Sequence, residues 1–341
     1  MAAWSHEVGS DTLFERTLLG EPILLYRDPA GQSIALTNRC CHRHAPLSLG
    51  RKEADCIRCN YHGLKFDRTG RCVEAPGQAS VPEKLCVRAW PMVERHNWLW
   101  LWMGDAVLAD PALIPAALSL DHPDWKFVSD YLHYQAPYLL ICDNLLDFSH
   151  LSYVHANTLG GSTDIAESRP QVTTSARSVR VQRFIPNTEP SPAQRQHHGL
   201  TGKVDRTFVY DFLAPAVMLL DTRSETVGEP EGPRLHMHSC QALTPETETT
   251  THYFFSQAHQ TGLSEPQDRK RIHTALLAAF AEDQHIIQAQ FRTMQASPGA
   301  ESMMPIAADL ALTQFRRVMS QLIDTESTAG QPLVRAEKNM A

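Results

Sequence analysis

The sequence predicts an α+β protein of two domains, a smaller antiparallel β domain followed by a larger domain that combines an antiparallel sheet with a long helix. Short strand-like runs between turn residues occupy the first part of the chain. Longer alternating runs occupy residues 169–260, and an apolar stripe at helical spacing follows over 266–294. A Gly-Asp pair and an Asp-Pro pair near residues 105–110 predict a boundary there, which gives domains 1–106 and 107–341.

Length, composition and charge describe an ordinary globular protein. The chain has 341 residues, of which 43% are hydrophobic and 20% are charged, enough for two domains with a substantial core. The net charge of −7 and the lack of a basic run argue against nucleic acid as a partner. No apolar run reaches the length of a membrane span, and the start of the chain lacks the basic and apolar regions of a signal peptide. We therefore expect a cytoplasmic protein.

Three features define the strands of the first domain. Residues 23–27 and 33–38 flank an Asp-Pro-Ala-Gly turn and predict a hairpin. A second hairpin is predicted over 64–76, around Arg68-Thr69-Gly70. Residues 98–102 alternate Trp and Leu, so that tryptophans lie on one face and leucines on the other. Because both faces are apolar, this run predicts a buried central strand.

The second domain is predicted to contain five strands and three helical segments. A short connector over 111–120 leads to a helical stretch over 138–158. Longer helices are predicted over 266–294 and 305–324, and the polar end, 325–341, is expected to fray. The predicted strands, separated by turn-rich gaps typical of an antiparallel sheet, cover 179–186, 206–213, 217–222, 234–243 and 251–258.

The strongest chemical signal is a set of two cysteines and two histidines between Cys40 and His62. They occur as Cys40-x-His42 and Cys59-x2-His62. A Rieske 2Fe–2S cluster needs this set, because one of its irons is bound by two cysteines and the other by two histidines. A tetrahedral zinc site is the alternative, but zinc sites bring like ligands together in short pairs. The mixed pairs favour the cluster.

Other cysteines and histidines in this stretch could compete for the same roles. Cys56-x2-Cys59 has the spacing of a redox or zinc pair, but a buried free thiol is the commoner fate of a residue such as Cys56. Cys41 and His44 are interpreted as loop residues that face elsewhere. Eight cysteines in the chain, clustered near histidines, suit a metal in a reducing compartment rather than a disulfide scaffold.

The segments HRHAPLSLG (42–50) and CNYHGLKFD (59–67) resemble the Rieske domain of Rieske non-haem iron oxygenases. Within that family the chain is most similar to the group of vanillate O-demethylase, dicamba demethylase and toluenesulfonate methyl-monooxygenase. The resemblance covers nearly the whole chain and implies that the second domain has the helix-grip shape. Family members usually begin several residues earlier, so the first strand, near Ala2-Ala3-Trp4, is expected to be shortened or altered.

A second constellation, His150-x4-His155, matches the mononuclear iron motif of this family. Five helical steps of about 100° leave the two histidines roughly 140° apart on a straight helix. If both bind one metal, the helix must distort. On spacing alone, two unrelated histidines on a helix are an equal alternative. The resemblance favours the iron site.

The third iron ligand is expected to be Asp283. Such iron sites use two histidines and one carboxylate, which leaves positions open for dioxygen. Asp283 falls on an apolar helical stripe, where an unpaired carboxylate is costly unless it binds metal. Glu282 lies off the stripe and is interpreted as a solvated neighbour. The stripe contains Leu276, Phe280, Asp283, Ile287 and Phe291.

Three further residues receive roles only through the resemblance. Asp147 is expected to bridge a cluster histidine and an iron histidine across a subunit boundary, and Asn144 to lie near the iron or simply on the helix surface. His236 aligns with a substrate-contacting histidine, although an ordinary strand histidine is the alternative. Leu220 and Thr274 stand about where dicamba demethylase uses Asn and Trp, so a different substrate is expected.

The resemblance implies the terminal oxygenase of a multi-component monooxygenase. Such an enzyme uses O2, a 2Fe–2S cluster and mononuclear Fe(II) to hydroxylate a methyl or methoxy group of a small aromatic acid or related compound. A separate reductase, alone or with a ferredoxin, would supply electrons from NAD(P)H, because this chain has no nucleotide-binding glycine loop. A homotrimer is implied. The alternatives are a ring-hydroxylating dioxygenase and an electron carrier fused to a binding domain.

Overall fold

The computed structural model describes residues 1–260, 266–297, 299 and 303–329. Three small antiparallel sheets form the N-terminal part, with strand orders β1-β10-β9, β2-β3-β4 and β5-β6-β7-β8. Their bounds are β1 Ala3–Trp4, β2 Phe14–Leu18, β3 Glu21–Arg27, β4 Ser33–Thr37, β5 Arg51–Glu53, β6 Cys56–Arg58, β7 Lys65–Phe66, β8 Cys72–Glu74, β9 Met92–Arg95 and β10 Trp98–Leu101.

Both predicted hairpins of this part are confirmed. β3 pairs with β4, and the Asp28 carboxylate accepts hydrogen bonds from two backbone N–H groups in the turn between them. β7 pairs with β8 around Gly70, whose φ is +81°. A Cβ at Gly70 would lie 2.0 Å from the carbonyl oxygen of Val87, so only glycine fits this turn.

The Trp-Leu run forms β10, the central strand of its sheet, as predicted. Trp98 and Leu99 are fully buried on its two faces, whereas Trp100 is half-buried. The strand ends at Leu101, one residue earlier than predicted. Trp4 of β1 packs its ring edge-on against Trp98, with centroids 4.8 Å apart, which ties the start of the chain into this sheet.

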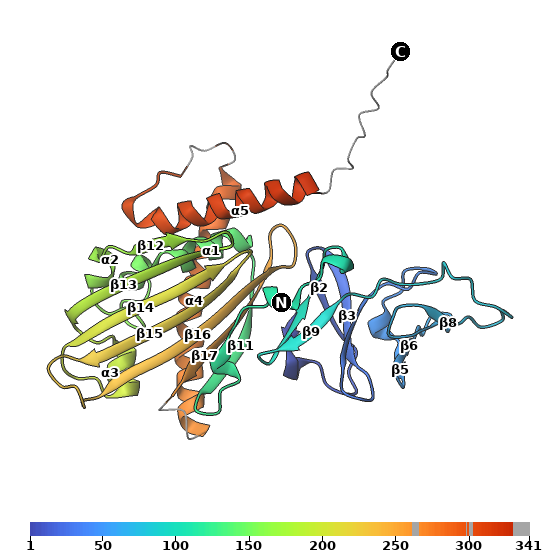
Figure 1. The fold of residues 1–341 in the computed structure, drawn as a ribbon, viewed down its shortest axis with the longest axis horizontal. Coiled ribbons are helices and arrows are strands. Elements are labelled where there is room, and N and C mark those ends of the chain that lie inside the picture. Colours follow the sequence, from blue (N-terminus) through green and yellow to red (C-terminus); the bar gives the residue numbers. More distant parts are fainter. Residues whose placement is uncertain (261–265, 298, 300–302, 330–341) are drawn as a thin grey trace, which may run out of the picture. The chain divides into compact units, whose positions relative to one another are not determined.

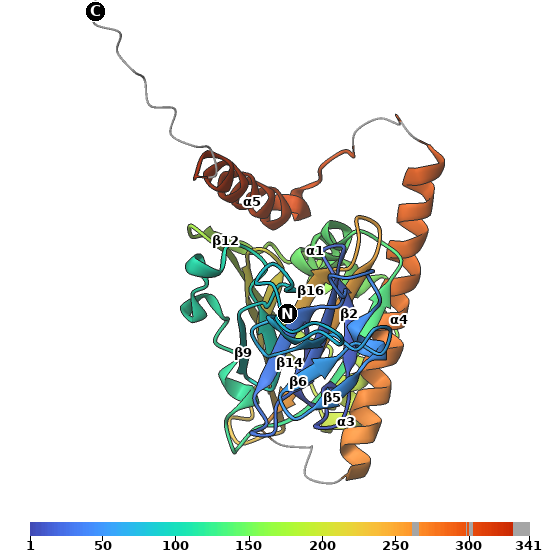
Figure 2. The ribbon, with the colours of Figure 1, turned by 90° about the vertical axis from the view of Figure 1, so that its right-hand side faces the viewer.

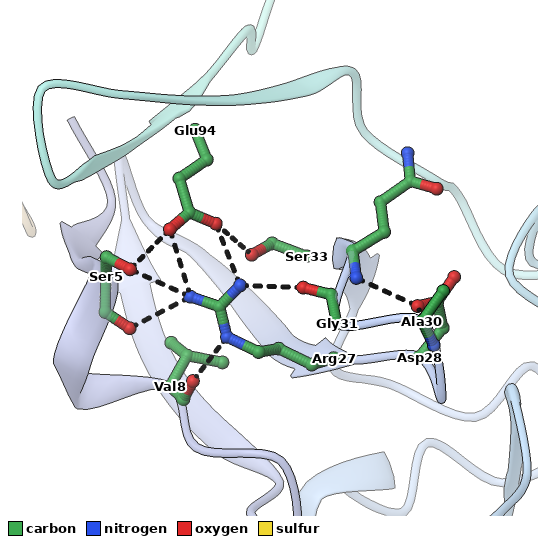
Figure 3. A network of polar contacts seen from close by, with 9 residues as sticks. Ser5, Val8, Arg27, Asp28, Ala30, Gly31, Ser33 and Glu94 are labelled. Atoms are coloured by element: carbon green, nitrogen blue, oxygen red, sulfur yellow. Dashed lines mark hydrogen bonds and ion pairs between the residues drawn. The ribbon is translucent and has the colours of Figure 1, made fainter.

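The first strand, β1, has only two residues. Arg27 holds the segment that follows (Figure 3). Its guanidinium donates to the carbonyl oxygens of Val8 (2.8 Å), Ser5 (3.0 Å) and Gly31 (2.8 Å), and pairs with Glu94 at 2.8 Å. The pair with Arg27 lowers the pKa of the Glu94 carboxyl. Side-chain bonds therefore supplement the short strand pairing.

A seven-stranded antiparallel sheet dominates the rest of the chain (Figure 1), in the order β11-β17-β16-β15-β14-β13-β12. The five predicted strands are confirmed as β13 to β17. β11 and β12 were not predicted; β11 pairs along its whole length with β17, more than a hundred residues later in the chain. The bounds are β11 Lys126–Tyr134, β12 Gln171–Thr174, β13 Ser178–Thr188, β14 Val204–Leu213, β15 Val217–Thr226, β16 Arg234–Pro245 and β17 Thr251–His259.

The long helix α4 (Pro266–Ala296) confirms the predicted helix and packs on β11 and β17. Figure 2 shows this helix along its length. The ring centroids of Phe280 and Phe255 lie 4.6 Å apart, and the Tyr134 hydroxyl donates to the Phe280 carbonyl oxygen. The apolar stripe faces inward, with Leu276, Phe280, Asp283 and Ile287 buried. The buried face of α4 therefore contains one carboxylate, that of Asp283, among its apolar side chains.

The remaining helices depart from prediction at their ends. The stretch predicted as helix over 138–158 is α-helical only to Leu146, and the 3₁₀ turn η6 follows over Phe148–Ser152. The last helix, α5, begins at Leu310 rather than 305 and runs to Ala329, so 325–329 is helical rather than frayed; residues 330–341 lie outside the described part. No helix among the described residues is both long and apolar enough to cross a bilayer. The helices are α1 Tyr138–Leu146, α2 Asp164–Glu167, α3 Pro192–His198 and α5 Leu310–Ala329, with 3₁₀ turns η1 Ser5–Glu7, η2 Leu47–Leu49, η3 Ala106–Leu108, η4 Pro111–Leu113, η5 Leu118–Leu120, η6 Phe148–Ser152 and η7 Ala307–Asp309.

Candidate metal centres

Two loops of similar construction carry the first ligand set. The first loop follows β4, and Cys40 both donates its N–H to the Ala45 carbonyl and accepts from the His44 N–H, each at 2.9 Å. The second loop joins β6 to β7, and Cys59 donates to Leu64 (2.9 Å) and accepts from Gly63 (3.0 Å). Each cysteine thus stands at the base of a tight turn whose backbone is fixed by hydrogen bonds.

The four side chains divide into a buried sulfur side and an exposed nitrogen side. Cys40 and Cys59 are buried, while His42 and His62 are exposed with ring centroids 4.5 Å apart. Burial raises the pKa of the Cys40 thiol, so binding of iron there would release a proton. Reduced solvation, with His42 and Arg43 nearby, lowers the pKa of His62, which favours the neutral imidazole that a metal requires. This donor set fits a 2Fe–2S cluster of the Rieske type.

The competing residues have other surroundings. Cys56 is buried at the start of β6, with its sulfur 3.4 Å from a carboxylate oxygen of Asp55. Cys41 is half-buried. Burial raises the pKa of its thiol, and the nearby Cys72 adds a smaller effect in the same direction. His44 is exposed, at a φ of +57°.

The segment that carries the other two histidines is bent, as two histidines five residues apart require. α1 ends at Leu146, Asp147 is extended (φ −120°, ψ 104°), and η6 follows. The carbonyl oxygen of Asp147 accepts a hydrogen bond from His150 Nδ1 at 2.6 Å, so Nε2 is the unprotonated nitrogen of that ring, which can bind a metal. His155, fully buried, follows η6 with its ring centroid 5.3 Å from that of His150.

The chain returns sharply after His155. The Gly160 N–H donates to the His155 carbonyl oxygen at 3.0 Å. A Cβ at Gly160 would lie 1.7 Å from the carbonyl oxygen of Leu151, so any side chain would collide with the backbone between the two histidines.

His150, His155 and Asp283 offer a compact donor set. Their ligand atoms all lie within 4.8 Å of one another, and Asp283 is only 5% exposed. A buried carboxylate and two imidazoles form the donor set that non-haem Fe(II) takes while open coordination positions remain. This convergence could hold iron, and Glu282 beside it is half-buried rather than buried.

The side chains of Asn144 and Asp147 are both half-buried. The Asp147 carboxylate accepts hydrogen bonds from the backbone N–H (2.9 Å) and the hydroxyl of Ser149, and pairs with Arg183 at 3.2 Å. His150 thus donates its Nδ1–H to the backbone carbonyl of the same residue whose carboxylate pairs with Arg183. The sequence analysis did not single out Arg183; its signal is a cation at an inward position of an alternating strand.

His236 lies half-buried on β16, with Nε2 3.3 Å from the carboxylate of Asp221. Arg223 also holds Asp221, at 3.0 Å. Leu220 is buried on β15, and Thr274 is exposed on α4, with its hydroxyl donating to the Lys270 carbonyl. Asp221, which contacts both His236 and Arg223, was missed because a strand pattern does not reveal which polar residues meet.

Comparison with known sequence families matches both parts of the chain. Residues 1–90 match the Rieske [2Fe-2S] domain, and residues 134–325 match the vanillate O-demethylase oxygenase C-terminal domain. The chain belongs to the Rieske oxygenases of the vanillate O-demethylase type.

Relatives of this Rieske oxygenase match it along almost its whole length. The iron-sulfur subunit TsaM1 of the toluene-4-sulfonate monooxygenase system of Comamonas testosteroni is 43% identical, over 97% of this chain and 98% of that protein. The vanillate O-demethylase oxygenase subunit of a Pseudomonas strain is 31% identical, over 93% and 98%. The crystal structure of dicamba monooxygenase bound to 3,6-dichlorosalicylic acid matches with a TM-score of 0.88 and 31% identity, over 96% and 97%.

These matches confirm the predicted family, fold and cofactors. The protein is an oxygenase component of a Rieske monooxygenase system, with an N-terminal β domain and a C-terminal domain of a large antiparallel sheet and helices. Its cofactors are a Rieske 2Fe–2S cluster, which replaces the zinc alternative, and mononuclear iron. A dicamba monooxygenase structure with non-heme iron and dicamba also matches, at a TM-score of 0.80 and 30% identity over 96% and 97%.

Proposed function

We propose that this oxygenase hydroxylates a methyl or methoxy group on a small aromatic acid or sulfonate. A hydroxylated methoxy group would decompose to a phenol and formaldehyde, and a hydroxylated aryl methyl group would give an alcohol. The similarity to TsaM1 and to vanillate O-demethylase supports this substrate class. His236 is proposed to contact the substrate, with Leu220 and Thr274 giving a selectivity that differs from that of dicamba demethylase.

The ligands are proposed from the two donor sets. Cys40 and Cys59 would bind one iron of the cluster, and His42 and His62 the other. His150, His155 and Asp283 would bind the mononuclear iron, and the convergence of their donor atoms within 4.8 Å is the observation that carries the proposal. Iron with open positions supplies the activation of dioxygen. The chain contributes a fixed tautomer at His150 and a buried carboxylate at Asp283.

Electron supply and assembly complete the proposal. A separate reductase, directly or through a ferredoxin, would bring electrons from NAD(P)H to the cluster domain, residues 1–106. The catalytic domain, 107–341, would receive them within a homotrimer in which Asp147 of one subunit connects its iron site to the cluster of the next. Asn144 would lie near the iron. The ion pair between Asp147 and Arg183 supports a fixed position for the Asp147 side chain.

The test is oxygen consumption by the purified oxygenase and its reductase with a panel of methoxy- and methyl-substituted aromatic acids and sulfonates. We expect substrate-dependent oxygen uptake, with formaldehyde from methoxy compounds or an alcohol from methyl compounds. Dihydrodiol products would indicate a ring dioxygenase instead. A cluster that reduces and reoxidises while no compound of the panel is converted would indicate an electron carrier. The Asp283→Ala variant is the control for uptake that does not depend on the iron site.

A further inference from the structure

Arg183 is a buried cation beside the segment that carries the histidines. It lies on the inward face of β13 and is 2% exposed. Its Nη1 donates to the carbonyl oxygens of Ser168 (2.6 Å) and Ile165 (3.0 Å), and Nη2 donates to the Asp147 carboxylate at 3.2 Å. Its Nε–H has no acceptor among the described residues. Burying a guanidinium with one unsatisfied donor is costly, so the site needs a compensating interaction.

The compensating partner is Asp147, the residue that orients His150. The Asp147 carboxylate caps η6 through the Ser149 N–H, and its backbone carbonyl accepts the Nδ1–H of His150. The side chain and the carbonyl belong to one residue, so an ion pair that fixes the first also restricts the second. The Tyr210 hydroxyl, which donates to the Leu146 carbonyl at 2.8 Å, holds the preceding residue against the sheet.

We propose that Arg183 is a positioning residue for the iron site. Through its ion pair with Asp147 it fixes the carbonyl that keeps His150 in the tautomer whose unprotonated Nε2 can bind metal. This inference rests on the proposed role of His150 as an iron ligand. Metal-bound histidines depend on the acceptor at their second nitrogen, and loss of such an acceptor typically costs about 10–100-fold in metal affinity.

Arg206 provides a matched control on the neighbouring strand. It is 3% exposed, faces inward from β14, and donates to the carbonyl oxygens of Gly160 (3.0 Å) and Leu159 (3.3 Å). Its Nε–H also lacks an acceptor among the described residues. It shares burial, charge and carbonyl contacts with Arg183, but has no bond to Asp147. A role that is merely structural would be common to both arginines.

The experiment compares Fe(II) retention in the holoprotein of Arg183→Met, Arg183→Lys, Asp147→Asn, Arg206→Met and the two double variants with Asp147→Asn. Iron loss to a ferrous chelator is followed over time, and the visible absorption of the cluster reports whether each variant is folded. We expect Arg183→Met to lose iron about 10–100-fold faster than wild type. Arg183→Lys keeps the charge but reaches fewer acceptors, so its rate of iron loss should fall between those of wild type and Arg183→Met. It also provides a folded variant to measure if Arg183→Met does not fold.

The double variants identify the route of the effect. Adding Asp147→Asn to Arg183→Met should not speed iron loss further, because both substitutions remove the same ion pair. The effects of Asp147→Asn and Arg206→Met on the rate of iron loss should instead multiply. The ligand-field spectrum of the Co(II)-substituted site should change in both Arg183 variants. Normal iron retention together with an unchanged Co(II) spectrum in both Arg183 variants would overturn this inference. Effects of Arg183→Met and Asp147→Asn on iron loss that multiply in the double variant would also overturn it. Either result would leave the proposed iron site standing. A wild-type protein that binds no iron after reconstitution would overturn the proposed iron site as well.

Discussion

The rings of His42 and His62 lie with their centroids 4.5 Å apart and their planes at 68°, while Cys40 and Cys59 are buried in the same two loops. The nitrogen side of the proposed cluster site therefore faces outward and the sulfur side faces the core of the N-terminal part. Electrons would enter and leave most readily through the exposed imidazoles, because the thiolates lie beneath protein.

Replacement of Cys59 should abolish the cluster, because the remaining thiolate cannot bind the ferric iron on its own. We expect Cys59→Ala to lose the brown colour and, after reduction, the low average g-value EPR signal of a Rieske cluster. Cys56→Ala is the matched control, since Cys56 faces Asp55, and its signal should remain. A Rieske signal that persists in Cys59→Ala would reassign the ligand set.

Replacement of Asp283 should remove one metal only. Asp283→Ala should lose the mononuclear iron and the activity while it keeps the cluster, because the buried carboxylate belongs to the second donor set. Metal analysis and the EPR spectrum of the reduced protein measure the two sites separately. The neighbouring Glu282→Ala should keep both metals. If Glu282→Ala loses the iron and Asp283→Ala retains it, the third ligand is Glu282.

Asp147→Asn, compared with wild type at equal iron content, should keep the protein folded but slow electron transfer to the iron. The amide can still accept the Ser149 N–H, but it loses the charge that pairs with Arg183. We expect the reduced cluster to be oxidised at least about tenfold more slowly in a single turnover. The mass in solution should be that of a trimer for both proteins. Normal cluster oxidation in the variant, or an active monomer, would remove Asp147 from the electron path.

Arg27→Met should destabilise the N-terminal part. The guanidinium bonds three carbonyl oxygens and Glu94, and its side chain is 15% exposed, so screening by water is limited. Loss of such charge-assisted bonds typically costs on the order of 2 kcal/mol. Urea unfolding followed by the cluster absorption measures the change, and the exposed Arg71→Met is the control. Equal midpoints for both variants would contradict a role of Arg27 in stability.

His252 should make the protein sensitive to acid. Burial lowers its pKa from 6.5 to about 4, and its ring bonds the Thr17 carbonyl and the Tyr131 hydroxyl, each at 2.7 Å. As pH falls from 6.5 to about 4, the unfolded chain binds this proton and the folded chain does not, so stability is lost in that window, by up to about 3 kcal/mol. His252→Gln should show a smaller loss between these pH values, whereas the exposed His122→Gln should match wild type. An unchanged pH profile for His252→Gln would refute this assignment.

Local pattern predicted much of the fold, because alternation and helical spacing are properties of neighbouring residues. The runs that became β13 to β17 and the stripe of α4, including the place of Asp283 on it, are of this kind. β11 could not be predicted in the same way, since its strand character depends on pairing with β17. Arg183 was missed for a related reason: the sequence shows a cation on an inward face but does not reveal that Asp147 lies opposite.

The turn at Gly160 limits how this enzyme can be redesigned. Any side chain there would meet the Leu151 carbonyl at 1.7 Å, so the backbone between the two histidines would have to move. A mutant library built to change substrate range should keep glycine at this position and place its diversity elsewhere in the segment, for example at Tyr153, whose side chain is 70% exposed. The segment thus contains one position where any side chain meets the backbone beside another that is exposed, a contrast that deep mutational scanning would display directly.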